Sequence, residues 1–360
     1  MNDRLCFPYE DDMHDIPEGM NELIQVYNKM YDKVSREIFT SRLLLSLTEN
    51  YSYMKNVILH TDGGKKLNDI ILSKRGVPQY IYGAGIRGKR LIELFPKNNW
   101  KGIIDRYKSQ EKYRDVEIIN LEQFLAVYRP GTAIFVSNMF ETDNIVKSLL
   151  EKGIILEDIY VLNILDKEGA KNIYFDSECI KPLIDKEEIF VDIGCYDGKD
   201  SINYMKWSNN NEVKIYAFEP DIKNYQICKK NLDIYSNIKL LNIGLSDQEQ
   251  EVCVMGEGEM SYFGEGDGLR IYTNLLDNVI ADNRVGFIKM DVEGHEANVL
   301  KGAESIIREQ HPMLAISLYH KKSDIWRIPM LLLKFNSNYH FFMRYYGALS
   351  GDTVLYAVDC

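Results

Sequence analysis

The sequence predicts an α/β protein with two doubly wound, Rossmann-like sheets, preceded by a helical segment. Three observations support this prediction. Apolar residues recur at near-helical spacing from residue 21 to about residue 73. After residue 77, short apolar strands alternate with amphipathic helices, which is typical of parallel sheets. Two of these strands run directly into glycine-containing turns, at Gly83 and at Gly194. We therefore expect a helical segment over residues 1–75, a small α/β domain over residues 76–165 and a larger one over residues 166–360.

The composition indicates an acidic globular protein and argues against several classes of partner. The chain has 360 residues, of which 45% are hydrophobic, enough to fill more than one core. Its net charge of −11 repels phosphate backbones, so we expect no nucleic-acid partner. Apolar runs stay well short of the roughly 18 residues of a membrane span. Residues 1–15 lack the basic start and apolar run of a signal peptide, and the six cysteines form no CxxC pair. We expect a cytoplasmic protein.

The helical segment contains no pattern of catalytic residues. Its apolar spacing predicts two or three helices between Asn21 and Ser73, and Asp62-Gly63-Gly64 is interpreted as a stop or turn. We expect these helices to pack against the adjacent domain or against a second subunit. In the second case the protein would be a homo-oligomer.

The small α/β domain carries a glycine motif. A strand over residues 79–82 is followed by Gly83, Gly85 and Gly88, then by a helix over residues 89–95 and a second strand that ends at Asp105. This GxGxxG pattern with an acidic residue 17 positions beyond the last glycine is close to that of a dinucleotide-binding βαβ unit. An oxidoreductase that uses NAD or a nucleotide sugar is therefore one candidate function. No YxxxK-type catalytic pair follows the domain, which argues against it.

The larger domain opens with a different turn. A strand over residues 188–193 leads into Gly194 and Gly198, and the second strand ends at Glu219-Pro220, 21 residues after Gly198. A carboxylate in this position can accept both hydroxyls of a ribose, so the pattern indicates a nucleoside ligand.

Further strands and helices continue the alternation to the end of the chain. We expect a helix over residues 222–235, a strand over 238–243, a turn over 244–247, a strand over 285–291, one helix through Ala297 to Ile307, a strand over 314–318 and a closing strand over 352–358 at the sheet edge. The segment 256–268 contains five glycines and four acids, and we interpret it as a mobile loop. It is either a lid that touches the acceptor through Ser261, Tyr262 and Phe263, or an idle connection.

Four motifs of the larger domain carry a family resemblance. VDIGCYDG, AFEPD, NIGLSD and FIKMDVEGHEANVLKGAESII resemble the successive motifs of the FkbM family of S-adenosylmethionine-dependent methyltransferases, from about Ile173 to the C-terminus. The preceding region, with YDKVSREIFTSRLLLSLT and YIYGAGIRGKRL, is similar to an N-terminal extension in which a degenerate Rossmann domain precedes the methyltransferase. The resemblance implies a class I methyltransferase fold, S-adenosyl-L-methionine as cofactor and O-methyl transfer to a small-molecule or glycan acceptor.

The resemblance also implies a set of cofactor-binding residues. Around the methionine moiety it places Asp192, Gly194, Asp197 and Gly198, and by the adenine it places Gly244 and Leu245. Glu219, followed by Pro220, corresponds to the acceptor of the ribose hydroxyls. The triplet Cys195-Tyr196-Asp197 departs from the Ala-Asn-Ile or similar sequence that is frequent at this turn, so we expect its backbone to contribute more than its side chains.

Methyl transfer to a hydroxyl needs a base beside the acceptor. Asp291, Glu293 and His295 alternate just past a strand end, and His320 follows the next strand. We expect His295 or Asp291 to be the base, with His320 as the competing candidate. Carboxylates and histidines are also metal ligands, which leaves an assisting Mg²⁺ or similar ion open. The plainer alternatives are that Asp291 holds the loop or the cofactor amine, that Glu293 caps the next helix and that the protein binds the cofactor without catalysis.

Overall fold

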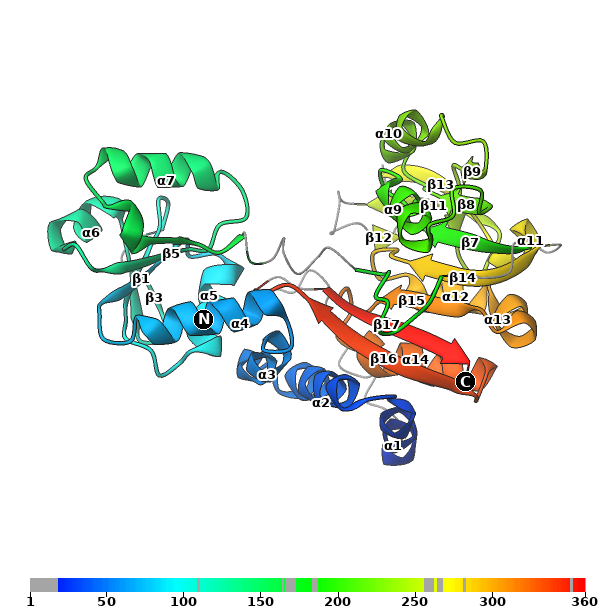
Figure 1. The fold of residues 1–360 in the computed structure, drawn as a ribbon, viewed down its shortest axis with the longest axis horizontal. Coiled ribbons are helices and arrows are strands. Elements are labelled where there is room, and N and C mark those ends of the chain that lie inside the picture. Colours follow the sequence, from blue (N-terminus) through cyan, green and yellow to red (C-terminus); the bar gives the residue numbers. More distant parts are fainter. Residues whose placement is uncertain are drawn as a thin grey trace. The chain divides into compact units, whose positions relative to one another are not determined.

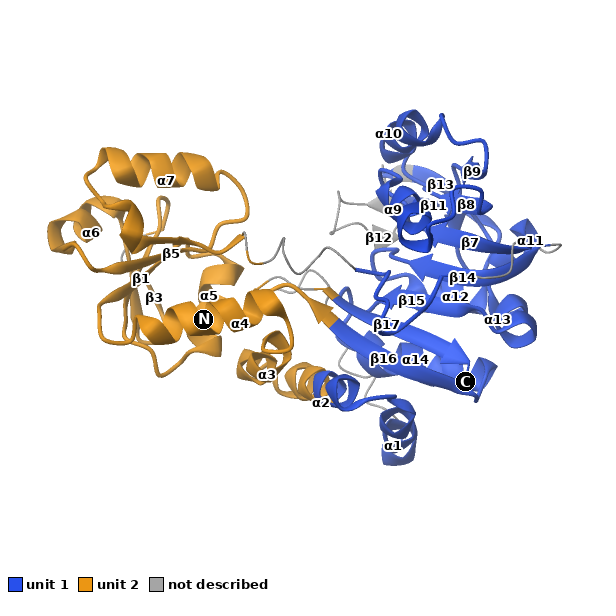
Figure 2. Ribbon diagram, viewed as in Figure 1, with its two compact units in different colours: residues 1–39, 172–344, 353–360 blue, residues 40–171, 345–352 orange. Residues whose placement is uncertain are grey.

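The computed structural model describes residues 19–108, 111–163, 165, 173–182, 187–255, 262–263, 268–280, 283–349 and 352–359. The chain, drawn in Figure 1, divides into two compact units. Unit 1 comprises residues 1–39, 172–344 and 353–360, and unit 2 comprises residues 40–171 and 345–352 (Figure 2). The boundaries of these two units, which are defined by contacts, differ from those of the three predicted segments. The division of the chain into three independently folding domains stays a prediction.

Unit 2 contains a Rossmann-like sheet whose strand order, among the described residues, is β3-β4-β2-β1-β5-β6. All its pairings are parallel except that of β3 with β4. The strands are β1 (Gln79–Tyr82), β2 (Trp100–Ile104), β3 (Glu111–Tyr113), β4 (Val116–Ile119), β5 (Ala133–Val136) and β6 (Ile159–Val161). The helices and 3-10 turns are η1 (Tyr51–Tyr53), α3 (Met54–Ile58), α4 (Asp62–Ser73), α5 (Ile86–Leu94), α6 (Leu121–Val127), α7 (Thr142–Glu151) and η2 (Leu156–Asp158). The predicted alternation of strands and helices is confirmed here.

The expected stop at Asp62-Gly63-Gly64 is wrong, because these residues begin α4. The Thr61 hydroxyl accepts a hydrogen bond from the Gly64 N–H at 2.9 Å and thereby caps the helix. A Cβ on Gly64 would lie 1.9 Å from the Ile58 carbonyl oxygen. The glycine therefore allows close packing within the first turn of a helix instead of ending one.

Unit 1 contains a larger sheet with the order β16-β17-β15-β14-β7-β8-β9 among the described residues. Its strands are β7 (Glu188–Ile193), β8 (Ile215–Phe218), β9 (Ile238–Leu241), β14 (Arg284–Met290), β15 (Met313–Ser317), β16 (Tyr339–Tyr346) and β17 (Asp352–Asp359). Its helices are α1 (Met20–Lys29), α9 (Lys199–Ser208), α10 (Ile222–Leu232), α11 (Leu276–Val279), α12 (Glu296–Lys301), α13 (Glu304–Gln310) and α14 (Asp324–Phe335), while α2 (Lys33–Thr48) crosses the division between the units. The parallel strand β7 lies between β8 and β14, so the order of strands reverses there. In open α/β sheets, ligands bind at the carboxyl ends of the strands on either side of such a reversal.

Three expectations about unit 1 are corrected. The closing strand β17 is not an edge, because it pairs antiparallel with β15 on one side and neighbours β16 on the other. The single helix expected after residue 296 is instead two helices, α12 and α13, because the helix is interrupted at Gly302. A Cβ on Gly302 would lie 1.9 Å from the Ser246 carbonyl oxygen. The expected turn over residues 244–247 contains the short strand β10 (Gly244–Leu245). It belongs to a second sheet of order β10-β13-β11-β12 in the described part of the chain, with β11 (Gln250–Met255), β12 (Tyr262–Phe263) and β13 (Leu269–Asn274).

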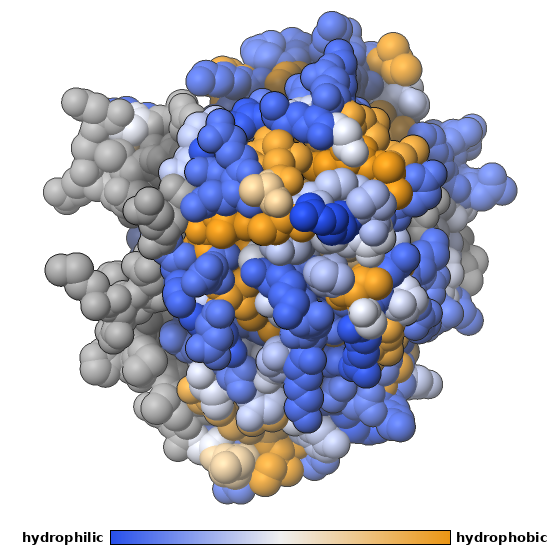
Figure 3. Space-filling view, turned by 90° about the vertical axis from the view of Figure 1, so that its left-hand side faces the viewer, coloured by the Kyte–Doolittle hydropathy of each residue, from blue (hydrophilic) through white to orange (hydrophobic). Residues whose placement is uncertain are grey.

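The N-terminal helix of the described chain packs within unit 1. Helix α1 contacts α14, and the Asp32 carboxylate that follows α1 forms an ion pair with Arg344 at 2.6 Å. Among the described residues, no helix has both the length and the apolar character needed to cross a bilayer. On the face of the molecule shown in Figure 3, hydrophilic side chains surround short apolar bands.

Candidate active site

The candidate site lies where β7 and β14 end side by side. The Asp291 N–H donates a hydrogen bond to the Ile193 carbonyl at 3.0 Å, and the Gly194 N–H donates to the Phe218 carbonyl at 3.0 Å. The turns after β7, β8 and β14 are therefore held together at one end of the sheet, at the reversal of strand order.

The turn after β7 depends on glycine. Gly194 has a φ of +72°, and a Cβ there would lie 1.8 Å from the Asp291 carbonyl oxygen. Gly198 has a φ of +79°, and its Cβ would lie 2.8 Å from Leu232 Cγ. These positions require both the left-handed backbone and the missing side chain. The missing side chains therefore allow the turn to pack closely against Asp291 and Leu232.

The three side chains between these glycines point to different surroundings. Cys195 is 2% exposed and packs in a small core with Ala217 and Cys228, whereas Tyr196 is 63% exposed. The Asp197 carboxylate accepts the Lys199 N–H at 3.1 Å and forms an ion pair with the Lys199 side chain. Cys195 and Asp197 thus have partners within the protein, which agrees with the expectation that the backbone matters most here.

Glu219 is held at the end of β8 by backbone hydrogen bonds. Its Oε2 accepts the Tyr196 N–H at 2.9 Å and its Oε1 accepts the Asp221 N–H at 2.9 Å. Burial raises the pKa of Glu219 to about 7, although these two hydrogen bonds oppose the shift. Each carboxylate oxygen has a second lone pair with which it can accept a ligand hydroxyl.

The residues predicted to lie by the adenine are near Glu219. The Asn242 amide donates to the carbonyl oxygens of Glu219 and Pro220 at 2.8 and 3.1 Å. A Cβ on Gly244 would lie 3.6 Å from Pro220 Cβ, and Gly244 and Leu245 are buried in β10. The structure therefore brings Glu219, Pro220 and Gly244 together.

A buried lysine that the sequence analysis missed connects three parts of the site. Lys289 in β14 is 1% exposed, and its Nζ lies 3.2 Å from Asp192 Oδ1 and 3.3 Å from Asp200 Oδ2. The same ammonium donates to the Gly194 carbonyl at 2.8 Å. Burial alone would lower the pKa of Lys289, but the two carboxylates outweigh it and raise the pKa. The feature of the sequence that could have indicated this buried lysine is a charged residue within an otherwise apolar strand, VGFIKM.

Asp192 is fully buried beside this lysine. Its Oδ2 also accepts a hydrogen bond from the Ser201 hydroxyl at 2.7 Å. The carboxylate therefore holds the turn from within the sheet, and its predicted contact with the methionine moiety stays a prediction.

Two tyrosines, also missed by the sequence analysis, orient Asp291. The Tyr174 hydroxyl donates to Asp291 Oδ2 at 2.8 Å, and the Tyr319 hydroxyl donates to Oδ1 at 3.1 Å. The Asp291 side chain is 23% exposed, so it remains accessible from outside the protein. Neither tyrosine is near Asp291 in the sequence pattern, since one precedes β7 and the other follows β15.

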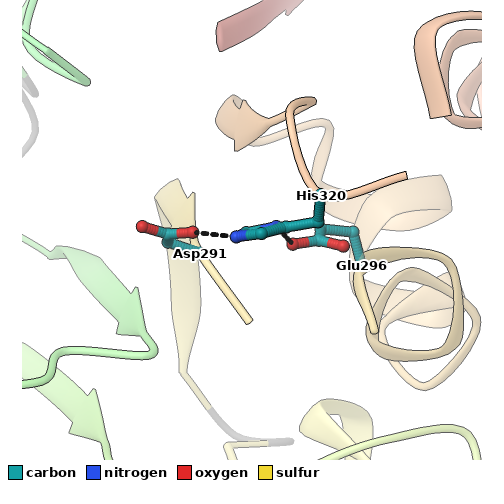
Figure 4. A group of neighbouring side chains, drawn as sticks. All are labelled: Asp291, Glu296 and His320. Carbon is teal, nitrogen blue, oxygen red and sulfur yellow. Dashed lines mark hydrogen bonds and ion pairs between the residues drawn. The ribbon is translucent and has the colours of Figure 1, made fainter. Parts of the chain in front are cut away.

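His320 lies among three carboxylates, and Figure 4 draws it with two of them, those of Asp291 and Glu296. Its Nδ1 is 2.8 Å from Glu296 Oε1, and its Nε2 is 3.2 Å from Glu293 Oε2 and 3.5 Å from Asp291 Oδ1. Burial lowers the pKa of His320, but Glu293 and Glu296 more than compensate and raise it to about 11. Glu296 was not among the predicted site residues. It takes the place expected for Glu293, because its Oε1 accepts the backbone N–H groups of the turn before α12 at 3.3 and 3.4 Å.

His295 differs from His320 in its electrostatic surroundings. It lies at the N-cap of α12 rather than in its first turn. Burial and the charge of Lys321 lower the pKa of His295 to about 4. At neutral pH this imidazole is uncharged and a weak proton acceptor.

The glycine motif of unit 2 is held by hydrogen bonds and contacts among its own residues. Asp105 accepts three backbone hydrogen bonds, from Ala84 at 2.8 Å, Tyr107 at 2.9 Å and Lys108 at 3.0 Å. A Cβ on Gly88 would lie 2.1 Å from the Gly83 carbonyl oxygen. The Asp105 carboxylate thus holds its own loop.

Of the predicted acceptor loop, Ser261 lies outside the described residues, as do the side chains of Tyr262 and Phe263.

Comparison with known proteins identifies similar sequences and a similar fold. Residues 192–347 match the family model of the methyltransferase FkbM domain. The 2-O-methyltransferase NoeI of Sinorhizobium fredii (strain NBRC 101917 / NGR234) is 21% identical over 154 residues, which cover 36% of this chain and 63% of that protein. The match therefore spans less than two thirds of this relative.

One of the solved structures that resemble this chain shows the same fold. The crystal structure of methyltransferase FkbM from Methylobacillus flagellatus KT covers 87% of this chain and 100% of that chain, with a TM-score of 0.50 and 18% identity. The structure of Aeropyrum pernix fibrillarin with natively bound S-adenosyl-L-methionine covers 53% of this chain and 76% of that chain, with a TM-score of 0.35 and 12% identity, too distant to locate residues here. The chain thus shares the fold of a solved class I methyltransferase structure. More particularly, residues 192–347 match the methyltransferase FkbM domain, the family that the motifs of this region resemble.

Replacing Gly194 by alanine is expected to destabilise unit 1, because the new Cβ would collide with the Asp291 carbonyl and the φ of +72° is unfavourable for alanine. We expect the free energy of unfolding to fall by about 2 kcal/mol or more in urea titration followed by circular dichroism. Gly85→Ala is the matched control, since no described atom lies within 4 Å of the place that its Cβ would take. It should cost no more than about 1 kcal/mol. Equal losses in both variants would contradict this account of the turn.

Replacing Lys289 by methionine is expected to leave Asp192 and Asp200 without their buried counter-charge. Breaking such a buried ion pair typically costs about 3–5 kcal/mol of unfolding free energy. Lys239→Met, on the exposed side of β9, serves as control and should change stability by about 0.5 kcal/mol at most. Thermal and urea unfolding measure both variants, and an unchanged Lys289→Met protein would show that the network contributes little.

Proposed function

We propose that this enzyme is an S-adenosylmethionine-dependent O-methyltransferase that acts on a hydroxyl of a small-molecule or glycan acceptor. The observation that carries the proposal is the position of Glu219 and the Gly194 turn beside Asp291, at the reversal of strand order in unit 1. The name of the relative NoeI, a 2-O-methyltransferase, supports oxygen as the methylated atom. The net charge of −11 favours an acceptor that is not a polyanion.

The residues around Gly194 and Glu219 fit a nucleoside cofactor. The second lone pairs of the Glu219 carboxylate would accept the two ribose hydroxyls, while Pro220, Gly244 and Leu245 line the adenine side. The backbone of residues 194–198 would lie against the methionine moiety. When bound, S-adenosylmethionine supplies a methyl group on a sulfonium ion, which is already activated for transfer.

The protein then has to align the acceptor oxygen and remove its proton. We assign this task to Asp291 and Glu293, whose side chains are 23% and 35% exposed, whereas that of His320 is 2% exposed. Tyr174 and Tyr319 fix the orientation of the Asp291 carboxylate. The positive charge of His320, on the buried side of the cluster, compensates the negative charge of the carboxylates. Because its pKa is lowered to about 4, His295 is the weaker candidate for the base.

Calorimetric titration of the full-length protein tests the cofactor site. We expect binding of S-adenosylhomocysteine that is lost in Glu219→Ala and retained in Gly85→Val, because the two substitutions lie in different glycine motifs. NAD and NADH serve as competing ligands in the same experiment. Dinucleotide binding that is lost only in Gly85→Val, without a response to S-adenosylhomocysteine, would overturn the proposal and favour an oxidoreductase.

The raised pKa of Glu219 predicts that cofactor affinity depends on pH. The ionised carboxylate is the better acceptor of ribose hydroxyls, and with a pKa of about 7 it is mostly protonated at acid pH. The affinity for S-adenosylhomocysteine should therefore rise about tenfold between about pH 6 and about pH 8. Glu219→Gln should bind more weakly and without this slope. The same slope in both proteins would assign the titration to another group.

A further inference from the structure

We propose that the cluster formed by Asp291, Glu293, Glu296 and His320 binds a divalent cation, with His320 Nε2, Asp291 Oδ1 and Glu293 Oε2 as its protein ligands. Glu296 would orient the histidine without touching the ion. The inference deepens the proposed function and rests on it, since the ion would hold the acceptor oxygen. Its binding is nevertheless measurable without any acceptor or cofactor.

The distances in the cluster suit a coordination shell. Two oxygens approach His320 Nε2, Glu293 Oε2 at 3.2 Å and Asp291 Oδ1 at 3.5 Å. Ligand atoms about 2.1 Å from an octahedral ion lie about 3 Å from their neighbours, close to these separations. Figure 4 shows the imidazole of His320 between Asp291 on one side and Glu296 on the other. Only small movements would therefore be needed to enclose an ion.

The buried imidazole provides an independent indication of a ligand. His320 is 8% exposed, and its Nε2 has no hydrogen-bond partner among the described residues. Its Nδ1 is 2.8 Å from Glu296 Oε1, and Glu296 is fully buried. With the Nδ1 proton donated to Glu296, an ion bound in place of the Nε2 proton would lie on the side of the two carboxylate oxygens. Metal-binding histidines commonly donate their other ring N–H to a carboxylate in this way.

The charges also require a positive partner at this place. Two carboxylate oxygens and an imidazole lone pair repel one another unless a proton or a cation lies between them. Without an ion, the proton on Nε2 lies there, in the ion pair with Glu293 Oε2 at 3.2 Å, and a bound cation would take its place. Even with His320 protonated, the three carboxylates leave an excess of negative charge. The side chain of Lys321, which approaches Gly294, is the nearby cation on the same segment.

One nitrogen and two oxygen ligands suit a first-row divalent ion such as Mn²⁺ and allow Mg²⁺. The ion would bind the acceptor hydroxyl and lower its pKa. The O–H bond then breaks with its proton passing to a carboxylate of the cluster or to water. The oxygen lone pair forms the new C–O bond, and the bond from the methyl carbon to sulfur breaks with its electrons left on sulfur. The products are the methyl ether and S-adenosylhomocysteine.

Mn²⁺ binding to the full-length, EDTA-treated protein tests the proposal, with free Mn²⁺ measured by electron paramagnetic resonance. We expect one Mn²⁺ per chain, displaced by excess Mg²⁺. Glu293→Gln should weaken binding about tenfold or more, and Glu296→Gln should weaken it by a similar factor through the loss of histidine orientation. Glu304→Gln, an exposed carboxylate in α13, is the matched control and should bind as the parent protein does.

Affinity for S-adenosylhomocysteine, measured without metal, separates this proposal from the proposed function. If it is retained in Glu293→Gln and Glu296→Gln, the variants are folded and the Mn²⁺ result stands by itself. Absence of Mn²⁺ binding by a protein that binds S-adenosylhomocysteine would overturn the metal site and leave the methyltransferase assignment intact. Equal Mn²⁺ affinity in Glu293→Gln and Glu304→Gln would overturn it as well.

Discussion

The buried ammonium of Lys289 ties together the parts from which the site is built. It projects from β14 to the Asp192 carboxylate on β7, to Asp200 on α9 and to the Gly194 carbonyl in the turn. Burying any one of these charges alone would cost several kcal/mol, so each is stable only while the others stay in place. The glycine turn is therefore fixed against β14, and with it the distance between this turn and Asp291.

This constraint gives the two halves of the site different physical characters. On the β8 side, backbone N–H groups hold the Glu219 carboxylate. On the β14 side, Asp291, Glu293 and His320 bring charged groups together, with the imidazole of His320 beside the carboxylates. The first half suits a neutral nucleoside with hydroxyl groups. The second suits a proton transfer and a cation.

The sequence predicted local features well and long-range ones poorly. Gly194, Gly198 and Glu219 could be predicted because strand, turn and helix follow one another within a short stretch. The grouping of Asp291 with Tyr174 and His320 could not, since these residues come from separate segments that only the fold brings together. The break at Gly302 has the same origin, because the carbonyl that excludes a side chain there belongs to Ser246. Likewise, the alternation of strands and helices did not indicate β16, which lies beside β17. For this reason the sequence predicted β17 as the edge strand.

The most direct test of the central claim is a crystal structure of the protein with S-adenosylhomocysteine. The account predicts the ribose hydroxyls within hydrogen-bond distance of Glu219 and the homocysteine against the Gly194 turn, with its sulfur facing Asp291. A nucleoside bound instead at the Gly83 loop of unit 2, or one whose ribose avoids Glu219, would contradict it.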